Sequence, residues 1–389
     1  MPVIVHIDMN CFFASCEVKK DPSLKGKKII IGGLSNRSIV SASSYEARGD
    51  GIYTTMPMYL AKEKCKDGVF LPIDHEYYCK VSNEIFSFLK SRYKVVEVVS
   101  IDEAFIDMSD VYLGNDPKLY FASLQKEIYE TLHIPCSIGV SYCKFLAKMG
   151  SDYKKPLGIT FIKKKDVSSI IWPLKISDCF GIGKASSAKL EEIGVKKIGD
   201  LITFEEAKVR EILGSYYDSI IPLVKGEIAE RITIKYEAPK SIGNSHTLDY
   251  NTDNYEIIKE NIKYLCDEVS GRLKAAKMLG YTITLTIKDK NFISKSRSKQ
   301  IIEPTDDNDK ILIESLKLFE KFENKIVRLV GGSVSSLLYK DQYYQQLSLF
   351  SKEKIANDST LDLIRKLNNL AGKDIFIKAK DAKINDKRN

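Results

Sequence analysis

The sequence is poor in several features that mark common protein classes. It has one Trp, four His and only ten Arg among its 60 basic residues, so Lys carries most of the positive charge. No apolar run approaches the roughly 20 residues of a membrane helix, and the start MPVIVHIDMN lacks the basic region of a signal peptide. These absences argue against a membrane role, and we expect a cytoplasmic protein.

Cysteine patterns typical of zinc sites are also absent. The eight Cys residues form no CxxC pair and no His-flanked zinc spacing. We therefore expect them to be small buried side chains in a reducing compartment.

The length and charge predict several domains and permit a polyanionic partner. At 389 residues, 44% of them hydrophobic, the chain exceeds the usual size of one domain. The 60 Lys and Arg against 52 Asp and Glu leave a net charge of +8. This mild excess allows a nucleic-acid partner but does not establish one.

The most informative stretch is VVEVVSIDEAFIDMS at 95–109, where two adjacent acids separate two runs of β-forming residues. We expect Asp102 and Glu103 at or near a hairpin between buried strands, where they are costly unless a cation neutralises them. Another β-run, PVIVHID, ends in Asp8. Two divalent cations about 4 Å apart need shared carboxylate ligands, which these three acids would supply. For an isolated acid pair, a solvated turn is the simpler explanation.

Three other side chains suit contacts with a triphosphate. Tyr45 and Arg48 are three residues apart, on one face of a helical turn, and a forked guanidinium matches phosphate oxygens. Lys155 precedes a proline, where helix is disfavoured, so we expect it at a fixed turn. Taken alone, a surface helix and a loop lysine are the simpler explanations.

Two aromatic residues follow the first acid at the expected start of a helix. Phe12 is expected in the core, as paired aromatics usually are. Phe13 lies five residues beyond Asp8 and could instead press its ring against whatever the metals hold.

Together these motifs resemble the Y-family DNA polymerases, most closely the bacterial DNA polymerase IV type. Asp8, the Phe13 position, SYEAR at 44–48, SIDEA at 100–104 and KP at 155–156 occur in the family's order and spacing. The resemblance covers about residues 1–340. It implies a steric gate that excludes a ribose 2'-hydroxyl at Phe13. It implies two Mg2+ ions, for which Mn2+ could substitute, held by Asp8, the Met9 carbonyl, Asp102 and Glu103. It implies triphosphate contacts from Tyr45, Arg48 and Lys155.

The chain departs from the family pattern at three places near these motifs. Ala42 stands where Thr is common, Gly49-Asp50-Gly51 replaces a basic-aromatic-Gly run, and Leu157 stands where Asn is common. These departures concern nucleotide affinity and the local shape of the fingers, and they leave the expected metal chemistry unchanged.

The resemblance implies an α+β multidomain fold of the right-hand polymerase type. Its implied parts are a palm at 1–19 and 75–163, small fingers at 20–74, a helical thumb at 164–236, a linker at 237–241, an α+β little finger at 242–340 and a tail at 341–389. The residue pattern itself predicts helices at 75–93, 117–131, 253–276 and 308–322, and strands at 135–140, 281–287 and 325–330.

Two regions favour contacts with DNA phosphates. The segment ISDCFGIGK at 176–184 resembles a helix-hairpin-helix, in which Gly181, Gly183 and Lys184 present backbone N–H groups at a helix N-terminus. A simple helix corner is the alternative. Basic residues far outnumber acidic ones between 270 and 300, so we expect a phosphate track at Arg272, Lys274, Lys277, Lys295, Arg297 and Lys299.

The tail contains the peptide QLSLF at 346–350. Apolar side chains outside a folded domain need a partner groove, and the peptide resembles the bacterial sliding-clamp-binding motif. We expect the clamp to be bound by Gln346, Leu347, Ser348, Leu349 and Phe350.

The function that the resemblance implies is low-fidelity, translesion DNA synthesis by two-metal phosphoryl transfer, without proofreading. Expected partners are primer-template DNA, deoxynucleoside triphosphates and the sliding clamp, with the chain itself a monomer. A nucleotidyl cyclase would not need the two DNA-binding regions. An inactive DNA-bridging protein would not need all three acids.

Overall fold

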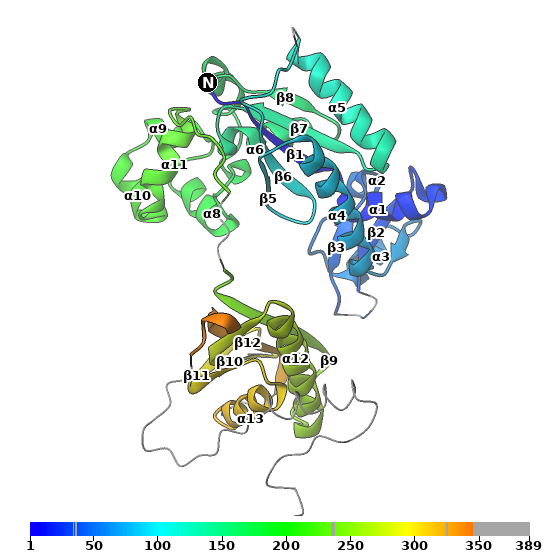
Figure 1. Cartoon of the computed structure of the whole chain (residues 1–389), viewed down its shortest axis with the longest axis vertical. Coiled ribbons are helices and arrows are strands. Elements are labelled where there is room, and N and C mark those ends of the chain that lie inside the picture. The colour runs from blue at the N-terminus through cyan, green and yellow to red at the C-terminus, as the bar shows by residue number, and fades with distance from the viewer. Residues whose placement is uncertain (34, 36, 115, 235–237, 324–325, 345–389) are drawn as a thin grey trace, which may run out of the picture.

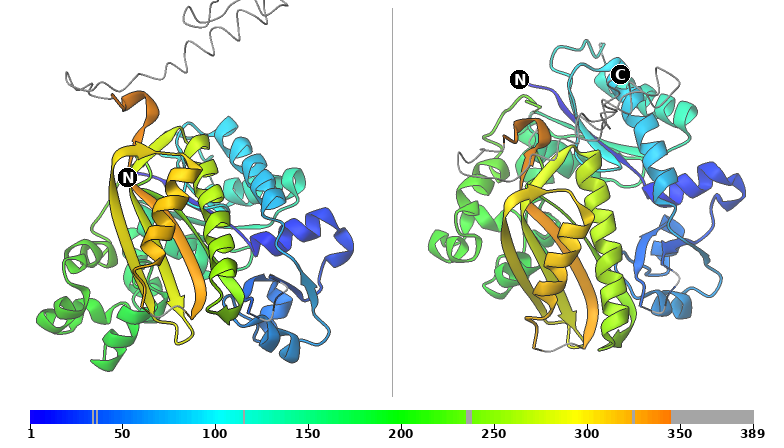
Figure 2. Two further views of the ribbon diagram at one scale, coloured as in Figure 1. Left: turned by 90° about the horizontal axis from the view of Figure 1, so that it is seen from below. Right: turned by 60° about the horizontal axis from the view of Figure 1, so that its bottom comes forward.

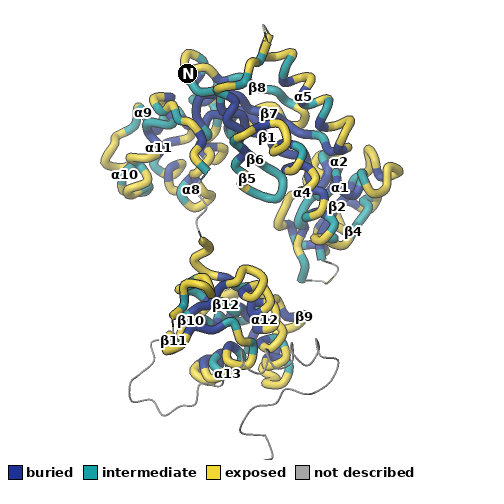
Figure 3. The backbone as a smooth tube through the Cα atoms, viewed as in Figure 1, coloured by how far each residue is buried: buried dark blue, intermediate teal, exposed yellow. Residues whose placement is uncertain are grey.

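The computed structural model describes residues 1–344 apart from 34, 36, 115, 235–237 and 324–325. That part of the chain forms three β-sheets, each covered by helices, and one unit made of helices alone (Figure 1). The four-stranded sheet and its helices form a separate layer, which Figure 2 shows from two further directions. Buried residues follow the sheets, and exposed residues gather on the outer sides of the helices (Figure 3).

The five-stranded sheet has the order β5-β6-β1-β7-β8, with β1 antiparallel to both of its neighbours. All residues of β1 and β7 are buried because helices cover both faces of the sheet. Alternate residues of β1 face α6 or the opposite layer, which contains α4 and α5. The strands are β1 Ile4–Met9, β5 Val96–Val98, β6 Glu103–Asp107, β7 Cys136–Ser141 and β8 Ile159–Phe161. The helices are α4 His75–Arg92, α5 Pro117–Leu132 and α6 Lys144–Tyr153.

A three-stranded sheet in the order β3-β2-β4 forms the second unit. Its small core joins Ile30 and Val40 to Met56 and Met58, which flank Pro57. The strands are β2 Ile29–Gly32, β3 Val40–Ser43 and β4 Val69–Leu71. The helices are α1 Phe12–Lys20, η1 Pro22–Leu24, α2 Tyr45–Gly49 and α3 Met58–Lys64.

The third unit consists of short helices around a core of aliphatic side chains, including Ile176, Leu190 and Val209. Its helices are η2 Lys164–Asp166, α7 Val167–Ile170, η3 Ile176–Asp178, α8 Lys184–Glu192, α9 Asp200–Thr203, α10 Glu206–Leu213 and α11 Tyr216–Val224.

The fourth unit is a sheet in the order β11-β10-β12-β9 with two helices on one face. Its strands are β9 Ser241–Thr252, β10 Met278–Asp289, β11 Ser294–Thr305 and β12 Val327–Tyr339. Its helices are α12 Tyr255–Ala275, α13 Asn308–Phe319 and η4 Lys340–Gln342. Two of its strands, β9 and β11, were not expected from the sequence. Both are edge strands and mostly exposed, so they lack the apolar alternation that marks a strand.

The segment after α11 was expected to belong to the helical thumb, but it contacts the five-stranded sheet instead. Residues 227–234 return to the five-stranded sheet, where Glu230 N donates to the Tyr142 carbonyl at 3.1 Å and Ile232 N donates to Asp107 Oδ2 at 3.1 Å. Ile232 packs there with Ile4 and with other buried side chains. We call residues 227–234 the strap. The expected linker at 237–241 also reaches into β9, which begins at Ser241.

Candidate functional site

The sheet register brings the predicted acids together. Asp8, near the end of β1, is paired directly with Glu103 at the start of β6, and Met9 N donates to the Asp102 carbonyl at 2.9 Å. The hairpin expected around the acid pair is present, because β5 and β6 are antiparallel neighbours. The hairpin is not buried throughout, since Val98 in β5 and Val99 in the turn are 41% and 49% exposed.

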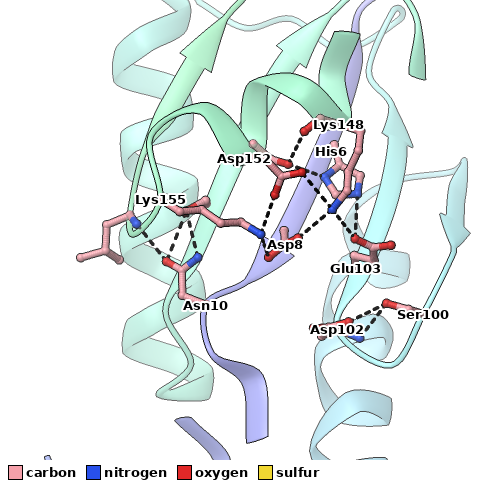
Figure 4. A network of polar contacts seen from close by, with 12 residues as sticks. His6, Asp8, Asn10, Ser100, Asp102, Glu103, Lys148, Asp152 and Lys155 are labelled. Carbon is pink, nitrogen blue, oxygen red and sulfur yellow. Dashed lines mark hydrogen bonds and ion pairs between the residues drawn. The ribbon is translucent and has the colours of Figure 1, made fainter. Parts of the chain in front are cut away.

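Two lysines lie against these acids. Lys148 Nζ is 3.0 Å from Asp8 Oδ2 and 2.6 Å from Glu103 Oε2 (Figure 4). Lys155 Nζ is 2.7 Å from Asp8 Oδ1, and Asp152 on α6 forms ion pairs with both lysines. Each oxygen of Asp8 therefore faces a different cation.

His6 lies fully buried beside the acids. Ser151 Oγ donates to the Lys148 carbonyl at 2.9 Å, so the 2.8 Å contact of His6 Nδ1 with this hydroxyl requires the proton on Nδ1. Among the described residues, His6 Nε2 has no hydrogen-bond partner, and it lies 3.5 Å from Glu103 Oε2. Burial lowers the pKa of His6, and the neighbouring Glu103 carboxylate opposes this effect.

Asp102 has a different partner, Ser100 (Figure 4). It accepts a hydrogen bond of 2.6 Å from Ser100 Oγ, and burial raises the pKa of its carboxyl group. In contrast, His6 and the Lys148 ammonium outweigh the effect of burial and hold the pKa of Glu103 at about 2. Burial lowers the pKa of Lys148, but the carboxylates around it raise that pKa by a larger amount. The net pKa is therefore above its ordinary value, and the side chain is a permanent cation.

A cavity of about 250 Å³ joins the acids to the predicted nucleotide contacts. The acids that line it are Asp8 and Asp102. The other predicted site residues that line it are Met9, Phe13, Tyr45, Arg48 and Lys155. Segments far apart in the sequence thus supply carboxylates, cations and an aromatic ring to one space. Glu103 does not line the cavity, but it is linked to Asp8 through Lys148.

Phe13 is held at this cavity by the ring of Tyr78. The two rings are stacked, with centroids 4.4 Å apart and planes at 21°. The Tyr78 hydroxyl in turn donates to Glu17 Oε1 at 2.6 Å. Phe12 is in the core, with 4% of its surface exposed, which confirms the expectation for that residue.

The first turn of α2 supplies the cationic side of the cavity. Ser44 caps this helix, because its hydroxyl accepts from Ala47 N at 3.4 Å. The Arg48 guanidinium lies 5.0 Å from the centroid of the Tyr45 ring, a cation–π arrangement that aligns the two side chains.

The departures from the family pattern have local explanations. Ala42 lines the cavity, but the hydroxyl-bearing residues Ser41 and Thr54 line it as well. Asp50 forms an ion pair of 2.8 Å with Lys28, so its charge is already neutralised. Leu157 has a φ of +62° and donates its N–H to Asn10 Oδ1 at 2.9 Å.

The donor atoms fit hard divalent cations. The ligand atoms of His6, Asp8 and Glu103 lie within 4.8 Å of one another, and Asp8 also shares the cavity with Asp102. Asp8 is therefore the residue that both arrangements share. Carboxylate oxygens that already surround ammonium groups form a set that Mg2+ or Mn2+ prefers.

The predicted DNA contacts lie outside this cavity, in the third and fourth units. Gly181 has a φ of +90°, and a Cβ there would overlap the Tyr216 hydroxyl, while Gly183 and Lys184 begin α8. The predicted phosphate track does not form one continuous face. Lys295, Arg297 and Lys299 are paired in register with Ile287, Leu285 and Ile283, whose side chains face the helices.

Several of these basic residues already have partners in the protein. Arg297 stacks on the Phe322 ring at 5.6 Å, and Lys299 forms an ion pair of 2.6 Å with Glu314 on α13. Near the end of α12, Arg272 donates to the Gly243 carbonyl at 2.8 Å. Lys274 also lies on α12, and Lys277 follows that helix. The predicted clamp peptide at 346–350 lies outside the described residues.

Sequence reasoning missed the buried polar groups that support the acids. The most important is Lys148, with His6, Ser151 and Tyr78 beside it. The spacing of Lys148 and Asp152 was the available signal, since residues four apart share a helix face.

Comparisons with known proteins agree with this arrangement. The impB/mucB/samB family matches residues 7–152, its C-terminal domain matches 239–349, and its HHH motif matches 164–195. The chain is 37% identical over 386 residues to a protein from Oceanobacillus iheyensis named "DNA polymerase IV", and the alignment covers 97% of this chain and 92% of that protein. It is 36% identical to "DNA polymerase IV 1" of Bacillus subtilis, covering 95% and 91% of the two chains.

A solved structure gives the same result for the fold. The "Y-family DNA polymerase chimera Dbh-Dpo4(243-245)-Dbh" superposes with a TM-score of 0.78 at 25% identity, covering 87% of this chain and 99% of that one. The fold is therefore that of a right-hand polymerase with a palm, small fingers, a helical thumb and an α+β little finger, and we use these names for the four units in the order in which they were described. The chain belongs to the Y-family of DNA polymerases, the impB/mucB/samB family. No described helix is long and apolar enough to cross a membrane.

Proposed function

We propose that this chain is a template-directed DNA polymerase of the translesion type, which extends a primer 3' end with deoxynucleotides. The observation that carries the proposal is the single cavity lined by Asp8, Asp102, Phe13, Arg48 and Lys155. Acids for metal ions, cations for phosphates and a ring for the sugar are the three elements that nucleotidyl transfer needs at one place.

The acids would hold two divalent cations, Mg2+ or Mn2+. Bound there, the cations would make the primer 3'-hydroxyl more acidic and stabilise the charge on the leaving pyrophosphate. Asp8 would be the shared ligand, because it faces both Glu103 and the cavity that contains Asp102. The Met9 carbonyl, at the same end of β1, completes the proposed set.

The cationic side of the cavity would bind the triphosphate. Arg48 and Tyr45 are already aligned by their cation–π contact, so little side-chain ordering is needed when phosphate binds. Lys155 pairs with Asp8 in the chain alone but also lines the cavity, so a triphosphate could draw its ammonium across. Arg48 and Lys155 would offset charge on the phosphates, and the Tyr45 hydroxyl would donate a hydrogen bond to them.

Primer-template DNA would be held by the thumb and the little finger. Gly183 and Lys184 at the start of α8 suit a phosphate, as does the basic end of α12. The open face of the little-finger sheet adds a ladder of hydroxyl pairs, such as Thr284 with Ser298 and Thr286 with Ser296, each at 2.8 Å. Hydroxyls and backbone groups contact phosphates without reading sequence, which suits a polymerase.

We further propose that the chain acts as a monomer, lacks proofreading and is recruited by a sliding clamp. The palm acids form one of two groups of candidate metal ligands among the described residues, and the other group, Asp50, Cys65 and Asp67, has two acids that are already paired with Lys28. The peptide QLSLF follows the little finger in the sequence, so a clamp bound there would not need to contact the residues that line the cavity.

Primer extension with Mg2+ and the four deoxynucleoside triphosphates tests the proposal. The wild-type chain should extend a primer, and Asp102→Asn should lower incorporation about a thousandfold or more, because a metal ligand supplies several kcal/mol to the transition state. DNA binding, measured by fluorescence anisotropy, should persist in the variant, since Asp102 contacts no expected phosphate site. Template-independent activity, or full activity of Asp102→Asn, would contradict the proposal.

A further inference from the structure

Lys148 is a largely buried cation that contacts the acids and is not among the residues that line the nucleotide cavity. Its side chain is 14% exposed, and its ammonium contacts both Asp8 and Glu103. Unlike Lys155, it does not line the cavity. A bound triphosphate could therefore draw Lys155 away from Asp8 but has no direct access to Lys148.

The backbone around Lys148 is held firmly in place. Helix α6 lies directly on β7, because a Cβ on Gly139 would overlap the backbone of Ala147 and Ser151. The bond between His6 Nδ1 and Ser151 Oγ ties the same turn of α6 to β1. Since Ser151 also donates to the Lys148 carbonyl, the turn that carries Lys148 cannot shift without breaking this buried chain of bonds.

The position of Lys148 has an electrostatic consequence for metal binding. A divalent cation bound by Asp8 and Glu103 must share their oxygens with the ammonium group. Like charges at such short range repel strongly in a partly buried site. An incoming triphosphate brings negative charge to the other side of the cation and offsets that repulsion.

We propose that Lys148 is a positioning residue that makes metal binding at the palm acids depend on the incoming triphosphate. It holds the two carboxylates together in the chain alone, and it weakens the binding of a divalent cation until a nucleotide arrives. Metal and nucleotide then increase each other's affinity, because such coupling is reciprocal. This inference rests on the proposed metal role of Asp8 and Glu103.

The test is Mn2+ binding to the full-length protein, without DNA or nucleotide, followed by electron paramagnetic resonance of free Mn2+. Lys148→Met should bind Mn2+ about tenfold or more tightly than wild type, because a repelling unit charge has been removed. Lys148→Arg keeps the charge and should stay within about twofold of wild type on the same argument. The matched control is Lys144→Met, one turn earlier on α6, where the lysine pairs with Glu97 at 3.2 Å. It should also leave Mn2+ affinity unchanged.

Thermal melting is a second measurement, which keeps the inference testable if Lys148→Met is less stable than wild type. In EDTA this variant should melt below wild type, because two carboxylates lose their shared cation, and added Mn2+ should raise its melting temperature more than that of wild type. Equal stabilisation by Mn2+, or Mn2+ binding to Lys148→Met that is unchanged or weaker, would overturn the inference. So would Lys148→Arg binding as tightly as Lys148→Met.

Asp8→Asn separates this inference from the proposed function. If Asp8→Asn abolishes Mn2+ binding while Lys148→Met binds like wild type, only the role of Lys148 is wrong. If Mn2+ binding survives in Asp8→Asn, the metal site itself is misplaced, and both proposals fail.

Discussion

The position of Phe13 depends on contacts outside its own helix. Its ring stacks on Tyr78, and Tyr78 is fixed by its hydrogen bond to the buried Glu17. A ring that cannot rotate away is a steric barrier to any extra atom on the sugar of a nucleotide in the cavity. This support is visible only in the folded structure, because Tyr78 lies 65 residues along the chain.

Phe13→Val should admit ribonucleotides. Removing most of the ring opens space for a 2'-hydroxyl, so the preference for deoxyribonucleotides should fall by on the order of tenfold or more. Single-nucleotide incorporation of matched ribo- and deoxyribonucleotides measures this ratio. Phe12→Val is the control, because Phe12 is a core residue and its loss should reduce stability without changing sugar preference. An unchanged ratio in Phe13→Val would assign Phe13 to packing alone.

Leu157→Asn should stabilise the palm. Leu157 has a left-handed φ of +62°, which costs a residue with a branched side chain about 1 kcal/mol and is better tolerated by Asn. The side chain is also 54% exposed, so little apolar burial is lost. The midpoint of urea unfolding should therefore rise. Leu119→Asn is the control, since Leu119 is 70% exposed in the regular helix α5 and should show no gain.

Among the larger elements, the strap contacts the palm sheet at the end of β6, where Arg231 and Ile232 donate hydrogen bonds to Asp107. Asp107, at the end of β6, accepts from Arg231 Nε at 3.0 Å and from the backbone of Ile232 and Ser109. Burial raises the pKa of Asp107, but these donors lower it more, to about 2. The carboxyl side chain is 1% exposed, whereas that of Asp110, which shares Arg231, is 81% exposed.

Asp107→Asn should destabilise the protein in a pH-dependent way. Because the folded pKa lies below the unfolded value of 3.8, the ionised group stabilises the fold above pH 4 and loses this effect as the pH falls towards 2. The difference in unfolding free energy between wild type and variant should be about 2 kcal/mol at pH 7 and about half of that at pH 3. Urea unfolding at both values measures it. A constant difference, or an equal effect of Asp110→Asn, would contradict the role of the strap.

The strongly patterned elements could be predicted from the sequence, and the supporting contacts could not. The helices at 75–93 and 117–131 and the strand at 135–140 are found within one or two residues, as α4, α5 and β7. The exposed edge strands β9 and β11 lack apolar alternation, and the strap has no regular pattern at all.

The same division applies to the site. Asp8, Asp102 and Phe13 lie in short motifs, and each was predicted. Lys148 and His6 act through distant pairings that only the packing of α6 on the sheet creates. The basic residues between 270 and 300 were expected to form a phosphate track, but charge counts do not say which face of a strand a side chain occupies.

At the scale of the whole molecule, we propose that catalysis and recruitment by the clamp depend on different parts of the chain. The cavity lies in the palm and fingers, while the peptide at 346–350 follows the last described domain. A linear peptide can bind a partner groove without changing the geometry of a distant active site. Chemistry and clamp binding should then be separable by mutation.

Deletion of residues 346–350 should leave primer extension on short substrates within about twofold of wild type, and it should remove stimulation by a bacterial sliding clamp, because the tethering that raises local concentration is lost. Extension assays with and without clamp on long circular templates measure both effects. Deletion of residues 385–389 provides a control of equal length. Clamp stimulation that survives the first deletion would place the clamp contact elsewhere.

The central claim is that the three palm acids share a pair of divalent cations. Anomalous diffraction from crystals grown with Mn2+, primer-template DNA and a non-hydrolysable nucleotide tests it most directly. The account predicts two manganese peaks about 4 Å apart, bridged by Asp8 and in contact with Asp102 and Glu103. Manganese bound away from these carboxylates, or no manganese beside them in the presence of nucleotide, would contradict it.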